Sequence, residues 1–314
     1  MTKSSKYTND LNRRQRLSVE LVWGFCRLFS LQPDWFKYWV LSPLVRFVLY
    51  YIARYRVRLV KENLAYAFPE KSEEERKIIR HNFYRILSEV FVSTLDAAGD
   101  YRRNKFLDPN ETDTEAAALR TQLDGGSWIG LSAHFGQWEY LMFWGNFSAI
   151  KLLGVYHPLK SKVFDEVYIR MRSKPYVDPT PLKQTIRYCM TLQRDGVKFG
   201  VGLIADQNPP LAKDSHWIEF LGRETIFFEG GEKMALKLKL PVYFIYQRRL
   251  GRGVYRFAWE QIYDGKEDVE PFEITRRYVK KLEAAIRENP EMWLWSHKRW
   301  KHKRAKAEQR FKNL

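Results

Sequence analysis

The chain has 314 residues, of which 45% are hydrophobic and 16% aromatic, and its formal net charge is +17. This length and apolar content indicate one large or two smaller α/β domains and exclude a disordered protein. The charge favours an acidic partner such as nucleic acid, anionic lipid or an acidic carrier protein. Two cysteines are too few for a disulfide framework and lack metal-ligand spacing, so we expect a reducing compartment and no metal.

The N-terminal part of the chain is rich in apolar and aromatic residues. Residues 1–16 lack the apolar core and cleavage site of a signal peptide, and two apolar segments follow at 17–31 and 36–53. The second segment is interrupted by two basic residues and a proline, whereas a membrane span needs about 20 consecutive apolar residues. Its aromatic content and basic flanks favour a helix in the membrane interface, with a buried core helix as the alternative. We therefore predict a membrane-associating helical segment over residues 1–55.

A helix is predicted after this segment. Ser72 and Glu75 have the spacing of a capping box. Apolar residues then recur on one helical face, at Ile79, Phe83, Ile86, Leu87 and Val90. This pattern indicates a helix that faces the core, and residues 96–126 are then predicted as a polar surface connection.

The most informative stretch lies at residues 127–139. Residues 128–133 are small or apolar and follow a double-glycine turn, which is typical of a buried parallel strand, and residues 137–147 have the composition of a helix. His134 therefore ends the strand, and Glu139 lies in the first turn of the helix. The carboxyl ends of strands in an open α/β sheet form the crevice where ligands bind.

The spacing of His134 and Glu139 predicts a general base. A bend at the intervening glycine would bring the carboxylate beside the imidazole, fix its tautomer and raise its basicity. Such a pair can take a proton from an alcohol. The alternative is a helix-capping glutamate beside a buried histidine with ordinary hydrogen bonds. Gln137, between the two, is predicted to contact the substrate.

Further polar residues follow two later strands. Residues 151–156 form a predicted strand that ends at His157, and residues 199–205 form another that ends at Asp206 and Gln207. Because Asp206 and Gln207 lie at a strand carboxyl end, we expect them to bind substrate at the same edge as His134. His157 is also a candidate substrate-binding residue, to which the sequence assigns no specific role.

Two other candidate substrate-binding residues lie outside the strand ends. Arg170 is on a helical segment, where the alternative is a solvated surface charge. Gly230 opens a predicted helix whose free amide groups could hold a phosphate or an oxyanion, with a packing glycine as the alternative.

The C-terminal part completes the sheet. Residues 240–247 and 253–260 are predicted strands, and the second alternates apolar with polar residues as an edge strand does. Residues 273–289 form a predicted helix that Pro290 ends. A basic tail at 302–314 is either solvated or docked on anionic headgroups.

Five blocks of this sequence resemble one known family. The His-Phe-Gly-Gln-Trp-Glu block at 134–139 resembles the His-x4-Asp/Glu motif of the lysophospholipid acyltransferase-like superfamily, and more closely the lipid A biosynthesis acyltransferases that add late (secondary) acyl chains. The other blocks follow the family order over roughly residues 50–301: Glu62–Glu70, Val155–Pro158, Asp206–Gly222 and Trp293–Lys301. The chain departs from the family at His157, where an arginine is usual, and at Leu221, where a phenylalanine is usual.

The resemblance implies a fold and a reaction. The fold is α/β, with a mostly parallel central sheet flanked by helices, as an acyltransferase domain over residues 56–301. The reaction moves a fatty acyl chain directly from a thioester to a lipid hydroxyl, with His134 as base, Glu139 orienting it and no cofactor. The implied partners are acyl carrier protein (or coenzyme A) as donor, a phosphorylated lipid A precursor as acceptor in lipopolysaccharide biosynthesis, and the anionic cytoplasmic face of the inner membrane.

Three alternatives stay open from the sequence. The same chemistry could act on a lysophospholipid or an aminolipid. A basic non-catalytic protein of the membrane surface would need only the amphipathic segments. A nucleic-acid-binding protein would share the charge, but we find no helix-turn-helix or ribonucleoprotein motif and expect no nucleic acid partner.

Overall fold

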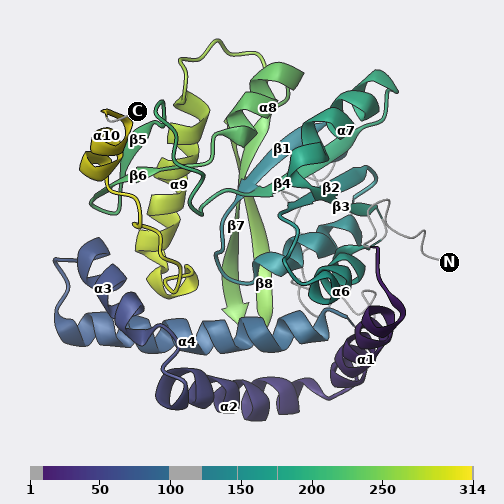
Figure 1. The fold of residues 1–314 in the computed structure, drawn as a ribbon, viewed down its shortest axis with the longest axis vertical. Coiled ribbons are helices and arrows are strands. Elements are labelled where there is room, and N and C mark those ends of the chain that lie inside the picture. Colours follow the sequence, from purple (N-terminus) through teal and green to yellow (C-terminus); the bar gives the residue numbers. More distant parts are fainter. Residues whose placement is uncertain (1–9, 99–121, 147, 175, 313–314) are drawn as a thin grey trace.

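A computed structural model describes residues 10–98, 122–146, 148–174 and 176–312 (Figure 1). In this part of the chain a six-stranded sheet has the order β3-β2-β4-β1-β7-β8, beside a separate β5-β6 pair. The strands are β1 Trp128–Ser132, β2 Lys151–Tyr156, β3 Val177–Pro181, β4 Phe199–Ile204, β5 Trp217–Phe220, β6 Arg223–Ile226, β7 Val242–Gly251 and β8 Val254–Tyr263. All pairings in the large sheet are parallel except that of β8, the edge strand. The predicted mostly parallel α/β sheet and its antiparallel edge are confirmed.

Helices cover both faces of the sheet. The α-helices are α1 Arg13–Ser30, α2 Ser42–Phe47, α3 Val57–Ala67, α4 Glu73–Asp96, α6 Lys162–Arg172, α7 Leu182–Arg194, α8 Gly230–Leu238, α9 Glu273–Glu288 and α10 Arg304–Lys312. The described residues also form two π-helices, η1 Phe36–Leu41 and η2 Val48–Ile52, and two 3-10 helices, η4 Trp138–Asn146 and η5 Pro290–Met292. In Figure 1, α4 and then α2 cross below the end of the sheet to which the arrow of β7 points. The carboxyl edge of the parallel strands therefore faces α4.

The predicted core helix is confirmed as α4. Ser72 and Glu75 make the reciprocal bonds of a capping box at its start, and all five apolar residues of the predicted face are buried. The sheet face that carries Leu131 and Leu203 packs against the start of α8, because a Cβ added at Gly231 would lie 2.5 Å from Leu131. The opposite face is covered in part by η4, through Trp144.

The N-terminal helices are attached to the domain by buried polar contacts. Lys37 and Asp96 form an ion pair of 2.7 Å with side chains that are 0% and 3% exposed, and the hydroxyls of Ser42 and Ser88 lie 2.9 Å apart. The outer faces of these helices remain exposed and apolar, at Leu17, Leu21, Phe25, Leu28, Leu31, Trp35, Trp39, Leu44, Phe47 and Ile52. Among the described helices, none has both the length and the hydropathy of a membrane span.

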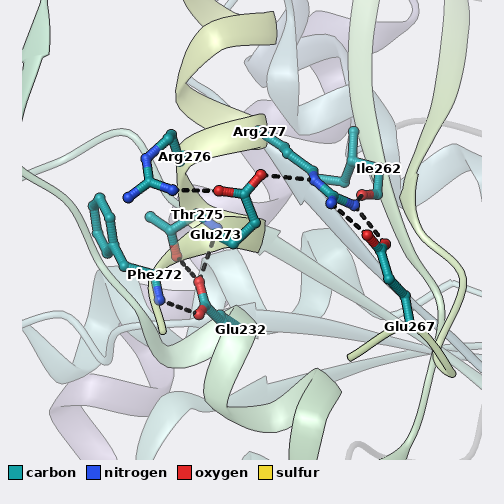
Figure 2. Close-up of polar contacts among 8 residues, drawn as sticks. All are labelled: Glu232, Ile262, Glu267, Phe272, Glu273, Thr275, Arg276 and Arg277. Carbon is teal, nitrogen blue, oxygen red and sulfur yellow. Dashed lines mark hydrogen bonds and ion pairs between the residues drawn. The ribbon is translucent and has the colours of Figure 1, made fainter. Parts of the chain in front are cut away.

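A polar cluster joins α8 to α9 (Figure 2). The Glu232 carboxylate is 4% exposed and accepts bonds from the backbone amides of Phe272, at 2.6 Å, and Thr275, at 2.8 Å. A carboxylate at these first-turn amides satisfies donors that a helix start leaves free. Beside it, Arg277 pairs with Glu267 and Glu273 and donates to the Ile262 carbonyl oxygen. These contacts hold α8, α9 and the end of β8 together.

Two of the differences from the predicted elements bear on the site and the sheet edge. The helix expected at 137–147 is a 3-10 helix, η4. Strand β3 was not predicted, because its sequence Val-Asp-Pro-Thr-Pro contains two prolines; it lies at the other edge of the sheet, where proline is tolerated. Most of the predicted surface connection at 96–126 lies outside the described residues.

Candidate active site

The segment after β1 is held in a bend by the C-terminal part of the chain. Gly136 has φ +63°, a left-handed conformation that glycine adopts without strain, and its amide donates to the Met292 carbonyl oxygen at 2.9 Å. The Leu294 amide donates to the His134 carbonyl oxygen at 3.0 Å. A Cβ at Gly136 would lie 2.7 Å from the Gln247 side-chain oxygen. The position of His134 is therefore set by backbone contacts on both sides.

The imidazole of His134 is oriented by Asp206, which follows β4. His134 Nδ1 lies 2.7 Å from Asp206 Oδ1, and the second carboxylate oxygen accepts a bond of 2.9 Å from Trp293 Nε1. Since an ionised carboxylate can only accept, Nδ1 carries the proton and Nε2 has the free lone pair. The Gln207 amide nitrogen lies 3.2 Å from Nε2. This tautomer leaves Nε2 able to act as a base.

Asp206 remains charged although it is buried. Its side chain is 3% exposed, and burial by itself would raise the pKa of the carboxyl group. The interactions with His134 and the bond from Trp293 outweigh burial and bring the pKa below its ordinary value. The imidazole therefore has a permanent negative charge beside Nδ1, which stabilises the imidazolium that forms when Nε2 takes a proton.

Glu139 has a different partner from the one predicted. Its carboxylate is bound by the guanidinium of Arg172 through two bonds, at 2.6 Å and 2.9 Å. In the structure the imidazole is thus oriented by Asp206 rather than by Glu139. The physical reason is the geometry of η4, which begins one residue after Gln137 and directs the Glu139 side chain toward α6, where Arg172 lies.

His134 and both members of the Glu139–Arg172 pair line one cavity of about 400 Å³. Gln207 and His157 also line it, and His157 is otherwise exposed. Away from these polar groups the cavity wall is mostly apolar, with Trp128, Trp144, Leu152, Val177, Ile245 and Trp259. The cavity therefore has a polar end that contains the base and an apolar body along the sheet.

Three predicted site residues have other surroundings. Gln137 is fully buried. Its side-chain nitrogen donates to the Val90 carbonyl oxygen at 3.2 Å, and its backbone amide donates to the side-chain oxygen of Gln247 at 2.7 Å. Arg170 pairs with Glu20 of α1 at 2.7 Å. A Cβ at Gly230 would lie 2.2 Å from the Phe228 ring, as expected of a packing glycine. None of the three is among the residues that line the cavity.

Sequence reasoning missed the roles of Arg172 and Trp293. The sequence assigns no role to Arg172, and only the fold, which brings the end of α6 to the carboxylate of Glu139, reveals the pair. Trp293 was noted within a C-terminal block, without a role. The available signal was the Trp-Leu-Trp-Ser-His block itself, which lies beside a run of basic residues. In the described residues no three His, Cys, Asp or Glu side chains gather as a metal site would require.

A comparison with known protein families finds a match over most of the chain. The sequence profile of the family described as bacterial lipid A biosynthesis acyltransferase matches residues 9–302. The match includes both strand ends that carry His134 and Asp206, the η4 segment, and the C-terminal block with Trp293. The comparison with curated proteins finds no match.

Proposed function

The chain belongs to the bacterial lipid A biosynthesis acyltransferase family and is thus an acyltransferase, and on this premise we propose that His134 is the general base that transfers a fatty acyl chain from a thioester to a hydroxyl of a lipid A precursor. The observation that supports the assignment is the His134–Asp206 pair at the polar end of a largely apolar cavity. A reactive head group with a long hydrocarbon tail needs this combination of surfaces.

The reaction follows from the tautomer. His134 Nε2 takes the proton of the acceptor hydroxyl while Nδ1 stays bonded to Asp206, and the alkoxide attacks the thioester carbonyl carbon. The tetrahedral intermediate collapses as the carbon–sulfur bond breaks. The imidazolium returns its proton to the departing thiolate. Gln207, which lies at Nε2, marks the place that the acceptor hydroxyl would take.

The transfer is direct, without an acyl-enzyme. Both cysteines are buried, and burial raises the pKa of Cys189 to about 12 and that of Cys26 above its usual value. A thiol in this state is not a nucleophile near neutral pH. Neither cysteine lines the cavity that holds His134.

Glu139 and Arg172 support the electrophile. Arg172 lines the cavity, and its guanidinium is held in one orientation by the two bonds to Glu139. A fixed cation beside the thioester stabilises the negative charge that develops on the carbonyl oxygen. Glu139 thus acts through Arg172, as a positioning residue.

The donor and the location follow from charge and exposed surface. A net charge of +17 suits an acidic acyl carrier protein as donor, a phosphorylated acceptor and anionic lipid headgroups. On α1, Leu17, Leu21, Phe25 and Leu28 recur at helical spacing and are each more than half exposed. Such a face lies in the interface of a bilayer, which we assign to the cytoplasmic side of the inner membrane.

Acyl transfer by the purified full-length chain tests this proposal. Wild-type protein should consume acyl carrier protein thioester when a lipid A precursor is present, and His134→Ala should reduce the rate to background while circular dichroism stays unchanged. His216→Ala is the matched control, because His216 also bonds a carboxylate, Glu229 at 2.9 Å, but does not line the cavity. Substantial turnover by His134→Ala would exclude His134 as the base. Transfer only to a lysophospholipid or an aminolipid would reassign the acceptor.

A further inference from the structure

Two glycines lie side by side beneath the apolar body of the cavity. Gly202 of β4 is in register with Gly154 of β2, and both line the cavity. Gly200, Gly202 and Ile204 alternate along β4 and all line it, so this is the sheet face toward which position 202 points. Its neighbour in register, Gly154, points to the same face.

The fold does not require glycine at either position. Neither residue has a positive φ. A Cβ at Gly202 would meet only the Leu153 carbonyl oxygen at 3.9 Å, and one at Gly154 only a Val177 methyl group at 3.9 Å. By contrast, a Cβ at Gly130 or Gly200 would lie 2.3 Å from a neighbouring side chain.

Glycine within a strand is costly, so these two need another reason. It destabilises a strand relative to alanine, and it often marks a place where a ligand approaches the backbone. Side chains at 154 and 202 would occupy the cavity without disturbing the packed core. The two glycines keep the cavity deep.

Three tryptophans form a wall of the cavity on the side of β1 and β8. Trp128 is the first residue of β1, its indole nitrogen donates to the Leu123 carbonyl oxygen at 3.1 Å, and its ring packs edge-on against Trp259 with centroids 5.2 Å apart. Trp144 packs on Trp259 at 4.8 Å. In the sheet order, Gly154 and Gly202 belong to β2 and β4, whereas Trp128 and Trp259 belong to β1 and β8. The cavity therefore extends across the sheet, from the two glycines to a rigid aromatic wall, with the base at its carboxyl edge.

We propose that Gly154 and Gly202 determine which acyl chains the enzyme accepts, and that the chain of the donor thioester lies over them with its end against the tryptophan wall. The inference rests on the proposed acyl transfer, since the thioester carbonyl must reach His134. A side chain at either glycine would take space that the acyl chain needs, and it favours shorter donors.

The test is a donor series of octanoyl, dodecanoyl and hexadecanoyl thioesters with wild type, Gly202→Val and Gly154→Val. We expect the ratio of long-chain to short-chain kcat/KM to fall roughly tenfold or more in each variant, because a few methylenes change discrimination by this amount. Gly202→Ala should shift the ratio less in the same direction. Gly251→Val is the matched control: Gly251 ends β7, has open space around it and does not line the cavity.

A second readout separates this inference from the proposed function. Binding of free dodecanoic and hexadecanoic acid, followed by tryptophan fluorescence, should weaken in Gly202→Val for the longer acid first, with or without enzyme turnover. Wild type that binds these acids but transfers no acyl group would contradict the proposed function alone. An unchanged chain-length ratio in well-folded variants, or a shift that follows the chain of the acceptor instead of the donor, would overturn the assignment of the two glycines.

Discussion

The carboxyl edge of the sheet buries polar side chains, whereas the N-terminal helices expose apolar ones. At the edge, charged and polar side chains are buried: Asp206 is 2% exposed and Gln137 is 0%. On the N-terminal helices, large apolar side chains are exposed, with Leu21 at 66% and Trp39 at 66%. Each arrangement costs free energy unless a partner compensates. His134 and backbone groups are the partners in the first region, and a lipid surface is the partner that we propose for the second. The contrast separates the site of the reaction from the surface that would bring the protein to its substrate.

The largest expected effect concerns the buried edge. Asp206→Asn keeps the size of the side chain but removes the charge beside Nδ1 and permits the wrong imidazole tautomer. We expect kcat to fall roughly a thousandfold or more, as loss of such a carboxylate does in other histidine-dependent enzymes. Steady-state acyl transfer checks this, with thermal unfolding as the control for folding. A loss below tenfold would show that the imidazole does not depend on Asp206.

Substitutions on the exposed apolar face of α1 should alter membrane binding instead of the acyl transfer reaction. Leu21→Glu with Phe25→Glu removes two apolar side chains that are 66% and 58% exposed. Partial burial of these two side chains in lipid contributes about 3 kcal/mol to the free energy of membrane binding. Their loss should therefore lower the affinity for anionic vesicles roughly a hundredfold. Vesicle sedimentation measures it, and Met190→Glu is the control, because Met190 is an exposed apolar residue on α7. Unchanged affinity would exclude α1 from the membrane contact.

Within the buried edge, the second carboxylate should matter less than the first. Glu139→Gln leaves Arg172 in place but loosens its orientation. A small displacement of a group that stabilises charge should lower kcat/KM roughly tenfold. In an Arg172→Gln background, Glu139→Gln should cause almost no further loss of kcat/KM, because Glu139 acts through Arg172. Additive losses in the double variant would show that Glu139 acts independently.

The smallest effect concerns acid stability near the site. His297 Nδ1 is buried without a hydrogen-bond partner, and burial lowers the pKa of this imidazole to about 4. In the unfolded chain His297 takes up a proton near its ordinary pKa of about 6.5, whereas in the folded protein it stays neutral until the pH is near 4. The free energy of unfolding therefore falls as the pH drops from about 6.5 to about 4.

His297→Gln should remove this loss, which partial solvent screening limits to about 1 kcal/mol. Urea unfolding at a neutral and an acidic pH measures it. His157→Gln, a change at an exposed histidine, should keep the wild-type dependence. An equal acid loss in His297→Gln and wild type would contradict the buried neutral imidazole.

Much of the sheet was predictable because its buried strands are short apolar runs that end in polar residues. The sequence placed β2 at its observed bounds and put His134 and Asp206 at the same edge. It could not pair them, since that contact depends on β1 and β4 being neighbours, which no local pattern encodes. The spacing of His134 and Glu139 suggested a nearer partner, but a 3-10 helix turns Glu139 away.

The remaining differences have the same origin. Arg170 and Gly230 were chosen for their residue types, and their surroundings are an ion pair to α1 and a packed aromatic ring. Strand β3 carries two prolines, which local propensity reads as a loop and which an edge position permits. Gly154 and Gly202 carry no sequence signal. Their meaning appears only when the register places them side by side in the cavity.

The pH dependence of kcat/KM in Asp206→Asn and Glu139→Gln, measured together, tests the central claim most directly. If Asp206 stabilises the imidazolium, its loss should move the acid limb of the profile to lower pH, because a proton then binds less readily, and the limb of Glu139→Gln should stay at the wild-type position. The reverse result, a displaced limb in Glu139→Gln and an unmoved one in Asp206→Asn, would contradict the account and identify Glu139 as the partner of His134.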